Sequence, residues 1–127
     1  MRMIKFRGKK IENGEWLYGD LVQDDRDCYY IYPNDCGGLY ANNKVDTKTI
    51  GQFTGLLDKN DKEIYEGDIL EIADEMYAKV VWNKEKAGFE YEYLHSTQIA
   101  NTFYEFNMPY LSVVGNIYDN KDLIKRK

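Results

Sequence analysis

The stretch MYAKVVWNKEKAGFEYEY, residues 76–93, decides the fold class of this chain. Before the polar turn at residues 83–88, apolar side chains recur at every second position. After the turn, aromatic residues at positions 89, 91 and 93 alternate with two glutamates. A period of two is the period of a β-strand, and the alternating glutamates indicate a strand with one side in water. The stretch therefore predicts two β-strands joined by a polar turn.

The same period continues toward the N-terminus. Residues 4–7 and 16–22 flank the pair Asn13-Gly14. This pair is a strong hairpin signal, because both residues tolerate a positive φ. The sequence thus predicts an early pair of strands around this turn.

Further strands are expected along the rest of the chain. The run at 28–32 predicts a strand that stops at Pro33, which cannot donate a ladder hydrogen bond. Residues 34–43 are rich in Gly, Asn and Asp and predict a loop. Short strands separated by polar turns predict a small barrel. The remaining strands are expected at 49–54, 69–72 and 111–118.

One segment breaks the period of two. Ile99, Phe103 and Phe106 fall at helical spacing, and Ser96 or Thr97 can cap the N-terminus of a helix. We therefore expect one short helix near residues 96–106. A last helical turn is expected within residues 119–124.

Length and composition predict one compact domain over residues 1–127. Hydrophobic residues make up 43% and charged residues 31% of the chain, the balance of an ordinary globular protein. The twelve tyrosines suit strand faces and contact surfaces, because each combines an apolar ring with a polar tip. Four of them are the predicted contact surface: Tyr29, Tyr30, Tyr91 and Tyr93.

The net charge of −5 argues against a nucleic-acid partner. Phosphates are neutralised by Lys and Arg, and the dense basic run is the tail at 121–127, which is typical of a solvated chain end. Nucleic acid is kept as the alternative partner, with the four tyrosines stacking bases beside Lys79 or the tail.

The sequence predicts a cytoplasmic protein without a membrane segment. Residues 1–7 are basic but lead into Gly8 and two lysines rather than an apolar signal core, and no apolar run is long enough to span a bilayer. Cys28 and Cys36 are expected to be reduced thiols in that compartment.

No catalytic, metal or cofactor site is predicted. His95 is the single histidine, so a nucleophile–histidine pair has one possible base and a four-ligand zinc site lacks ligands. The run at 58–63 lacks the glycine of a calcium loop, and the glycines at 51 and 55 lack the lysine of a phosphate loop.

The acidic stretch Glu66-Gly67-Asp68 has two possible roles. A pair of carboxylates can perform acid–base chemistry when one of them is buried, which leaves an enzyme as an alternative. The structural role is that Gly67 allows a tight turn while Asp68 accepts backbone hydrogen bonds. We therefore predict a turn-forming motif made of Gly55, Asp58, Glu66, Gly67 and Asp68.

Blocks of residues spread over nearly the whole chain resemble the YopX family, whose members are encoded by phages and prophages. Asp61 stands where the family often has glycine, and Lys121 stands where it often has proline. The matching blocks are residues 4–9, Gly14-Glu15-Trp16, Tyr18-Gly19, residues 51–56, 58–60 and 63–69, Val80-Val81-Trp82, Gly88-Phe89 and residues 114–120.

The resemblance implies a mainly β fold with an SH3-like barrel at about 51–127 and additional N-terminal strands at about 1–50. It also implies a phage origin and a place in the cytoplasm of a bacterial host, but no activity and no site residues. We expect a non-catalytic accessory protein that binds a host or phage protein. The alternatives are a nucleic-acid-binding small barrel and a carboxylate-dependent enzyme, and a homo-oligomer is left open.

Overall fold

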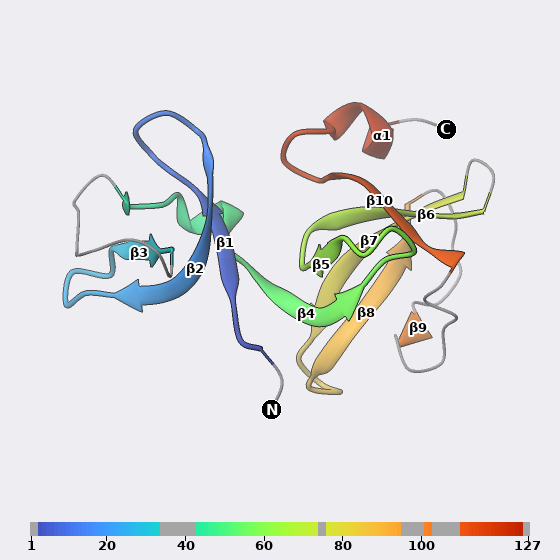
Figure 1. Cartoon of the computed structure of the whole chain (residues 1–127), viewed down its shortest axis with the longest axis horizontal. Helices are drawn as coiled ribbons and strands as arrows, with labels where there is room; N and C mark the ends of the chain where they lie inside the picture. The colour runs from blue at the N-terminus through green and yellow to red at the C-terminus, as the bar shows by residue number, and fades with distance from the viewer. Residues whose placement is uncertain (1–2, 34–42, 74–75, 95–100, 103–109, 126–127) are drawn as a thin grey trace. The chain divides into compact units, whose positions relative to one another are not determined.

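The structure is a computed structural model that describes residues 3–33, 43–73, 76–94, 101–102 and 110–125. Within these residues the chain forms strands β1 to β10, the short 3₁₀ helix η2 (Thr47–Thr49) and one short α-helix, α1 (Lys121–Lys125) (Figure 1). The predicted mainly β class is therefore confirmed.

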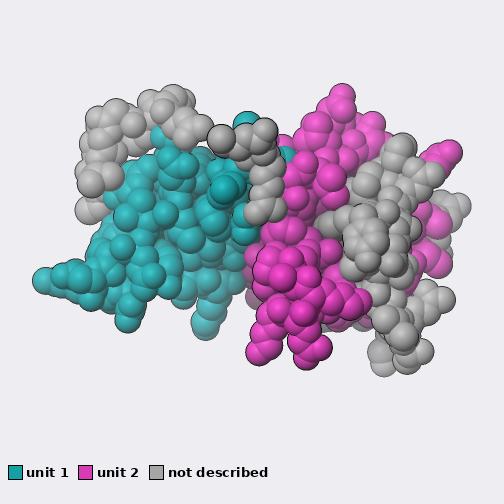
Figure 2. Space-filling model, turned by 90° about the horizontal axis from the view of Figure 1, so that it is seen from below, with its two compact units in different colours: residues 1–53 teal, residues 54–127 magenta. Residues whose placement is uncertain are grey.

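The chain divides into two compact units, Met1–Phe53 and Thr54–Lys127, which Figure 2 colours separately. Strand β4 (Gly51–Leu57) contains the boundary between them. Each unit is described by itself below. The single domain expected from chain length stays a prediction.

Unit 1 is built on an antiparallel sheet of β1 (Phe6–Lys9), β2 (Trp16–Gln23) and β3 (Tyr29–Tyr32), with the start of β4 beside β1. The predicted hairpin is confirmed, because β1 and β2 pair across a turn in which Gly14 has a φ of 76°. A positive φ is strained for residues with a Cβ, which explains glycine there.

One face of this sheet carries the core of unit 1. Ile31 and Val45 are 0% and 1% exposed. A Cβ added to Gly8 would lie 3.1 Å from Ile31 and 3.2 Å from Val45, so glycine lets these side chains approach β1. Phe6 and Leu17 belong to the same face by strand alternation.

Unit 2 is built on a second antiparallel sheet, in the order β10-β6-β7-β8-β9, with β5 beside β4. The predicted strand pair at 76–93 is confirmed as β7 and β8, with Val80 opposite Tyr91 and Trp82 opposite Phe89. The strands are β5 (Glu63–Tyr65), β6 (Asp68–Ala73), β7 (Met76–Asn83), β8 (Gly88–Tyr93), β9 (Asn101–Thr102) and β10 (Ser112–Asn116).

The core of unit 2 lies on the apolar face of this sheet and contains Ile64, Leu70, Ala78, Val80, Tyr91 and Leu111. The glutamates of β8 behave differently from each other. Glu92 is exposed as predicted, whereas Glu90 is 4% exposed and lies 3.1 Å from the Lys86 ammonium. A hydrogen bond from Asn83, with Lys86 nearby, holds the pKa of Glu90 below its ordinary value although burial acts in the opposite direction.

Two sequence expectations differ from the structure. Most of the predicted helix at 96–106 lies outside the described residues, and at Asn101–Thr102 the prediction is wrong, because these residues pair with Tyr91 and Glu90 as strand β9. Their backbone groups thus bond to a neighbouring strand instead of along a helix. The strand pairs of the described residues form open sheets, so the SH3-like barrel stays a prediction.

Three smaller expectations concern the ends and the cysteines. The last helical turn is confirmed by α1. Cys28 is a free thiol, while Cys36 and His95 lie outside the described residues. In the part of the chain that the structure describes, no helix combines the length and apolar character needed to cross a membrane.

Candidate functional site

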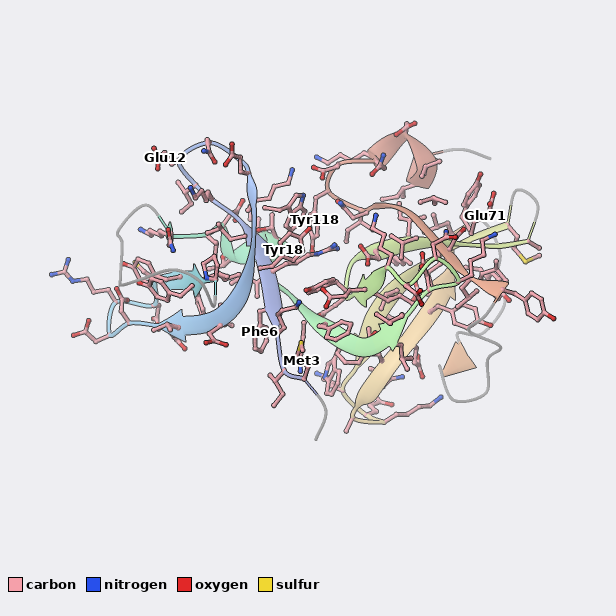
Figure 3. The ribbon with its side chains drawn as sticks, in the orientation of Figure 1. Met3, Phe6, Glu12, Tyr18, Glu71 and Tyr118 are labelled. Carbon is pink, nitrogen blue, oxygen red and sulfur yellow. The ribbon has the colours of Figure 1, made fainter. Side chains whose placement is uncertain are left out.

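Cations and aromatic rings gather on the second face of the unit 1 sheet, opposite Ile31 and Val45, and the β1 and β4 end of this face is buried, with Arg7 4% and Phe53 7% exposed. Arg7 lies opposite Tyr18, and Lys9 lies opposite Trp16, so alternation places these four side chains on one face. Figure 3 labels Tyr18 on this face and Phe6 on the other. We call the second face the cation–aromatic face: Lys5, Arg7, Lys9, Trp16, Tyr18, Asp20, Val22, Tyr30, Tyr32 and Phe53.

Each cation of this face lies over an aromatic ring. The Arg7 guanidinium is 4.7 Å and the Lys9 ammonium 5.4 Å from the centre of the Trp16 ring. The Lys5 ammonium is 5.8 Å from the centre of the Phe53 ring. These distances are within the range of cation–π attraction, which orients the cations over the rings. Arg7 is 4% exposed, whereas the two lysines are half-buried.

The β2 and β3 part of the face is partly open to solvent. Tyr18 and Val22 are 43% and 42% exposed, and Val22 lies opposite half-buried Tyr30. The rings of Tyr30 and Tyr32 are nearly parallel, with 6.3 Å between centroids and 12° between planes. A flat, partly apolar surface with polar hydroxyls is therefore available for contact.

Gly19 sets the spacing between these tyrosines. A Cβ at this position would overlap the carbonyl oxygen of Tyr32, so only glycine allows β2 and β3 to approach as they do. Its φ of 155° is also rare for residues with a side chain.

Asp24 holds Tyr30 in place. Its carboxylate accepts hydrogen bonds from the backbone amides of Cys28 at 3.0 Å and Arg26 at 2.9 Å, and from the Tyr30 hydroxyl at 3.2 Å. The two backbone bonds lower the pKa of Asp24. Partial loss of hydration, together with Asp24, raises the pKa of Tyr30. The hydrogen bond to Asp24 therefore orients the Tyr30 ring.

The charge of the chain is divided unequally between the two units. Unit 1 contains eight Lys or Arg residues and eight Asp or Glu residues, whereas unit 2 contains nine and fourteen. The net charge of −5 thus belongs to unit 2. Residues 1–11 contain five basic residues and no acidic one. The sequence-level argument against a polyanionic partner therefore does not apply to unit 1.

The predicted contact tyrosines do not form one surface. Tyr30 lies on the cation–aromatic face, and Tyr29 lies on the other side of β3. Tyr91 is 1% exposed within the core of unit 2, so its assignment to a contact surface is wrong. Its side of β8 packs against the core, and half-buried Tyr93 contacts it edge-on at 5.4 Å.

Asp58 of the predicted turn motif organises a turn of unit 2. Its carboxylate is 5% exposed and accepts hydrogen bonds from the amides of Asn60, Lys62 and Val113, at 2.8, 2.9 and 2.8 Å. Burial alone would raise the pKa of Asp58, but these bonds outweigh it and the pKa is lowered. Gly55, with a φ of 89°, lies within β4.

Asp68 also binds the backbone. It is 2% exposed and accepts a hydrogen bond of 2.7 Å from the amide of Tyr65, across the turn between β5 and β6. Gly67, with a φ of 92°, donates to the Val80 carbonyl at 2.9 Å. Glu66 is half-buried beside it. These contacts give the motif a structural role in the turn.

Sequence reasoning missed the cations of the site. Their signal is the placement of Lys5, Arg7 and Lys9 at alternate positions, which puts them on one face of a strand. Among the described residues, no group of three His, Cys, Asp or Glu side chains is arranged to hold a metal ion.

Comparison with known proteins gives a family and a fold. A family model described as YopX protein matches residues 5–125. The crystal structure of protein EF1440 from Enterococcus faecalis is similar, with a TM-score of 0.65 and 22% identity over 98% of this chain and 100% of that chain. At this identity the likeness shows the fold alone. The search of curated proteins found no match.

Proposed function

We propose that this chain, which belongs to the YopX family, is a non-catalytic binding protein that holds a macromolecular partner on its cation–aromatic face. We also propose a phage or prophage origin and a place in the host cytoplasm, as the family resemblance implies. The single observation that carries the binding role is the exposure of Tyr18 and Val22 among half-buried tyrosines on one sheet face.

The composition of this face is that of a contact surface. Tyrosines concentrate at recognition sites because a rigid ring supplies a large contact area at low entropic cost, and the hydroxyl adds polarity. Both partner classes expected from the sequence, a host or phage protein and a nucleic acid, use such rings.

The acids of unit 2 support a non-catalytic role. A general acid or base must be able to reach the proton that it transfers. Asp68 is 2% exposed and its carboxylate accepts a backbone hydrogen bond, and Asp58 accepts three. These contacts favour the structural role of the acidic motif over a carboxylate enzyme.

Two double variants of matched exposure test the site. Tyr18→Ser with Val22→Ser removes the exposed part of the face, and Met76→Ser with Val114→Ser removes side chains of unit 2 that are 42% and 40% exposed. Immobilised parent protein is incubated with separate protein and nucleic-acid fractions of a host-cell extract. We expect the face variant to lose about tenfold or more of the retained material, and the control to keep it.

Thermal unfolding of both variants checks that they are folded. Equal retention by the parent and the face variant would show that the contact surface lies elsewhere. If only the unit 2 control retains less material than the parent, the contact surface lies on unit 2.

A further inference from the structure

We infer that the partner held on the cation–aromatic face is single-stranded nucleic acid, an inference that rests on the proposed binding role. Three observations carry it: rings on neighbouring strands, Lys9 beside one of those rings with Lys5 on the same face, and a charge balance in unit 1 that does not repel a polyanion.

The rings supply stacking positions. Trp16 and Tyr18 lie on β2, and Tyr30 and Tyr32 lie on β3, which pairs with it. Side chains at alternate positions of a strand are spaced by about 6.4–6.8 Å, so a base can contact each ring in turn. Stacking on such rings tolerates any base, since every base has a π-face. Tyr18 is the most exposed residue of the four, at 43%.

The lysines supply phosphate contacts beside the rings. Lys5 and Lys9 project from the same face, are half-buried and are held within 6 Å of Phe53 and Trp16. Arg7 is 4% exposed, so its role is to add positive potential and to hold the Trp16 ring. Nucleic-acid backbones are bound by cations placed along a row of stacking rings.

The acids near the face restrict which nucleic acid fits. Asp20 is exposed on the same face opposite Tyr32, and Asp24 binds the Tyr30 hydroxyl. A duplex keeps its bases stacked inside and presents only its dense rows of phosphates, which these acids repel. A single strand can turn its bases toward β2 and β3 and leave its phosphates near β1. The face therefore selects single strands over duplexes.

Few cations are engaged, so binding is weak and depends modestly on salt. With two phosphates neutralised by Lys5 and Lys9, the slope of log K against log salt is expected to be about −1.5 for a single strand. This value distinguishes the face from a polybasic tail, for which four cations at 121–127 give a slope of about −3.

The test uses fluorescence anisotropy of labelled oligo(dT), oligo(U) and a hairpin duplex at low salt, with the full chain. We expect micromolar binding of both single strands and weaker binding of the duplex. Tyr18→Ser should weaken binding about tenfold, while Tyr18→Phe, which keeps the ring, stays within about twofold. Trp82→Phe leaves Trp16 as the sole tryptophan, and its fluorescence should be quenched by the single strands.

Matched lysine variants complete the test. The double variant of Lys5→Gln and Lys9→Gln should bring the salt slope close to zero, whereas Lys79→Gln in unit 2 should leave it unchanged. Duplex binding as tight as single-strand binding would overturn the inference, as would oligonucleotide binding that Tyr18→Ser does not weaken. No oligonucleotide binding at high-micromolar protein would also overturn it. If no oligonucleotide binds but the Tyr18 and Val22 double variant retains less protein from the extract than the parent does, the proposed binding role stands and the partner is a protein.

Discussion

Tyrosines on the strands of the two units meet opposite environments at Tyr18 and at Tyr65 and Tyr91. Tyr18 of unit 1 is 43% exposed, whereas Tyr65 and Tyr91 of unit 2 are 2% and 1% exposed. Both Tyr18 and Tyr91 lie at alternating positions of an antiparallel strand. The difference teaches that alternation identifies a face, and that only the packing around a strand decides whether the face becomes core or surface.

The units also differ in how they use charge. Unit 1 is neutral and places cations over aromatic rings, while unit 2 has an excess of five acids and uses two of them, Asp58 and Asp68, to bind backbone amides. The net charge of the whole chain therefore describes neither unit. Changes at equivalent positions of the two units separate these effects.

The largest expected effect comes from removing a tyrosine ring in each unit. Tyr91→Ala should lower the free energy of unfolding by about 3–5 kcal/mol, because it leaves a cavity in the core of unit 2. Tyr18→Ala deletes the same atoms from a partly solvated site and should cost less than about 1 kcal/mol. Urea unfolding measures both, and equal losses would contradict the assignment of Tyr18 to a surface.

The close approach of β2 and β3 is tested at glycine. Gly19→Ala should cost about 3 kcal/mol or more and separate the strands, since the new Cβ overlaps the Tyr32 carbonyl. Gly14→Ala meets no atom within 4 Å and should cost about 1 kcal/mol from its positive φ alone. Hydrogen exchange of residues 16–32 should rise in the first variant only. Similar exchange in both would show that the strands can move apart without penalty.

Asp58 gives unit 2 a dependence on pH. Because its folded-state pKa is lowered, its contribution is present above the unfolded pKa near 3.9 and is lost as pH falls through the folded value. Asp58→Ala should lose about 2 kcal/mol at neutral pH, since three amides lose their acceptor. Asp58→Asn should flatten the fall in stability below about pH 4.

Urea unfolding at a series of pH values measures this effect. Asp24→Ala of unit 1 is the comparison, and a smaller loss is expected there because Asp24 is less buried than Asp58. A parent-like acid profile for Asp58→Asn would show that other carboxylates control the transition.

The smallest effect is a gain in stability. Ala87 has a φ of 52°, in the left-handed region of the backbone. Asp61 has a φ of 62° and a polar side chain that makes this conformation easier to adopt, whereas Ala87 has no such side chain. Ala87→Gly should raise stability by about 0.5–1 kcal/mol and the melting temperature by a few degrees, and Asp61→Gly should give less. Calorimetry measures both changes, and a lower melting temperature for Ala87→Gly would contradict the strain.

Local patterns predicted the elements whose partners are close in sequence. The β7–β8 pair, the hairpin around Gly14 and the turn into α1 follow from alternation and turn residues. The strand at Asn101–Thr102 was not predicted, because its residues also fit a helix and pairing with β8 overrides this preference. Tyr30 of the candidate site was predicted from the sequence. The cations Lys5, Arg7 and Lys9 were not, because the net negative charge of the whole chain argued against a basic contact surface.

The sequence by itself determined the mainly β class, the strand pairs on either side of short turns and the family, because these depend on period, turn chemistry and residue order. Tertiary structure decided which faces are covered. It buried Tyr91 and Glu90 in unit 2, and in unit 1 it brought Arg7 and Lys9 of β1 beside the Trp16 ring of β2. Burial depends on what packs over a face, and that information is spread over residues far apart in the chain.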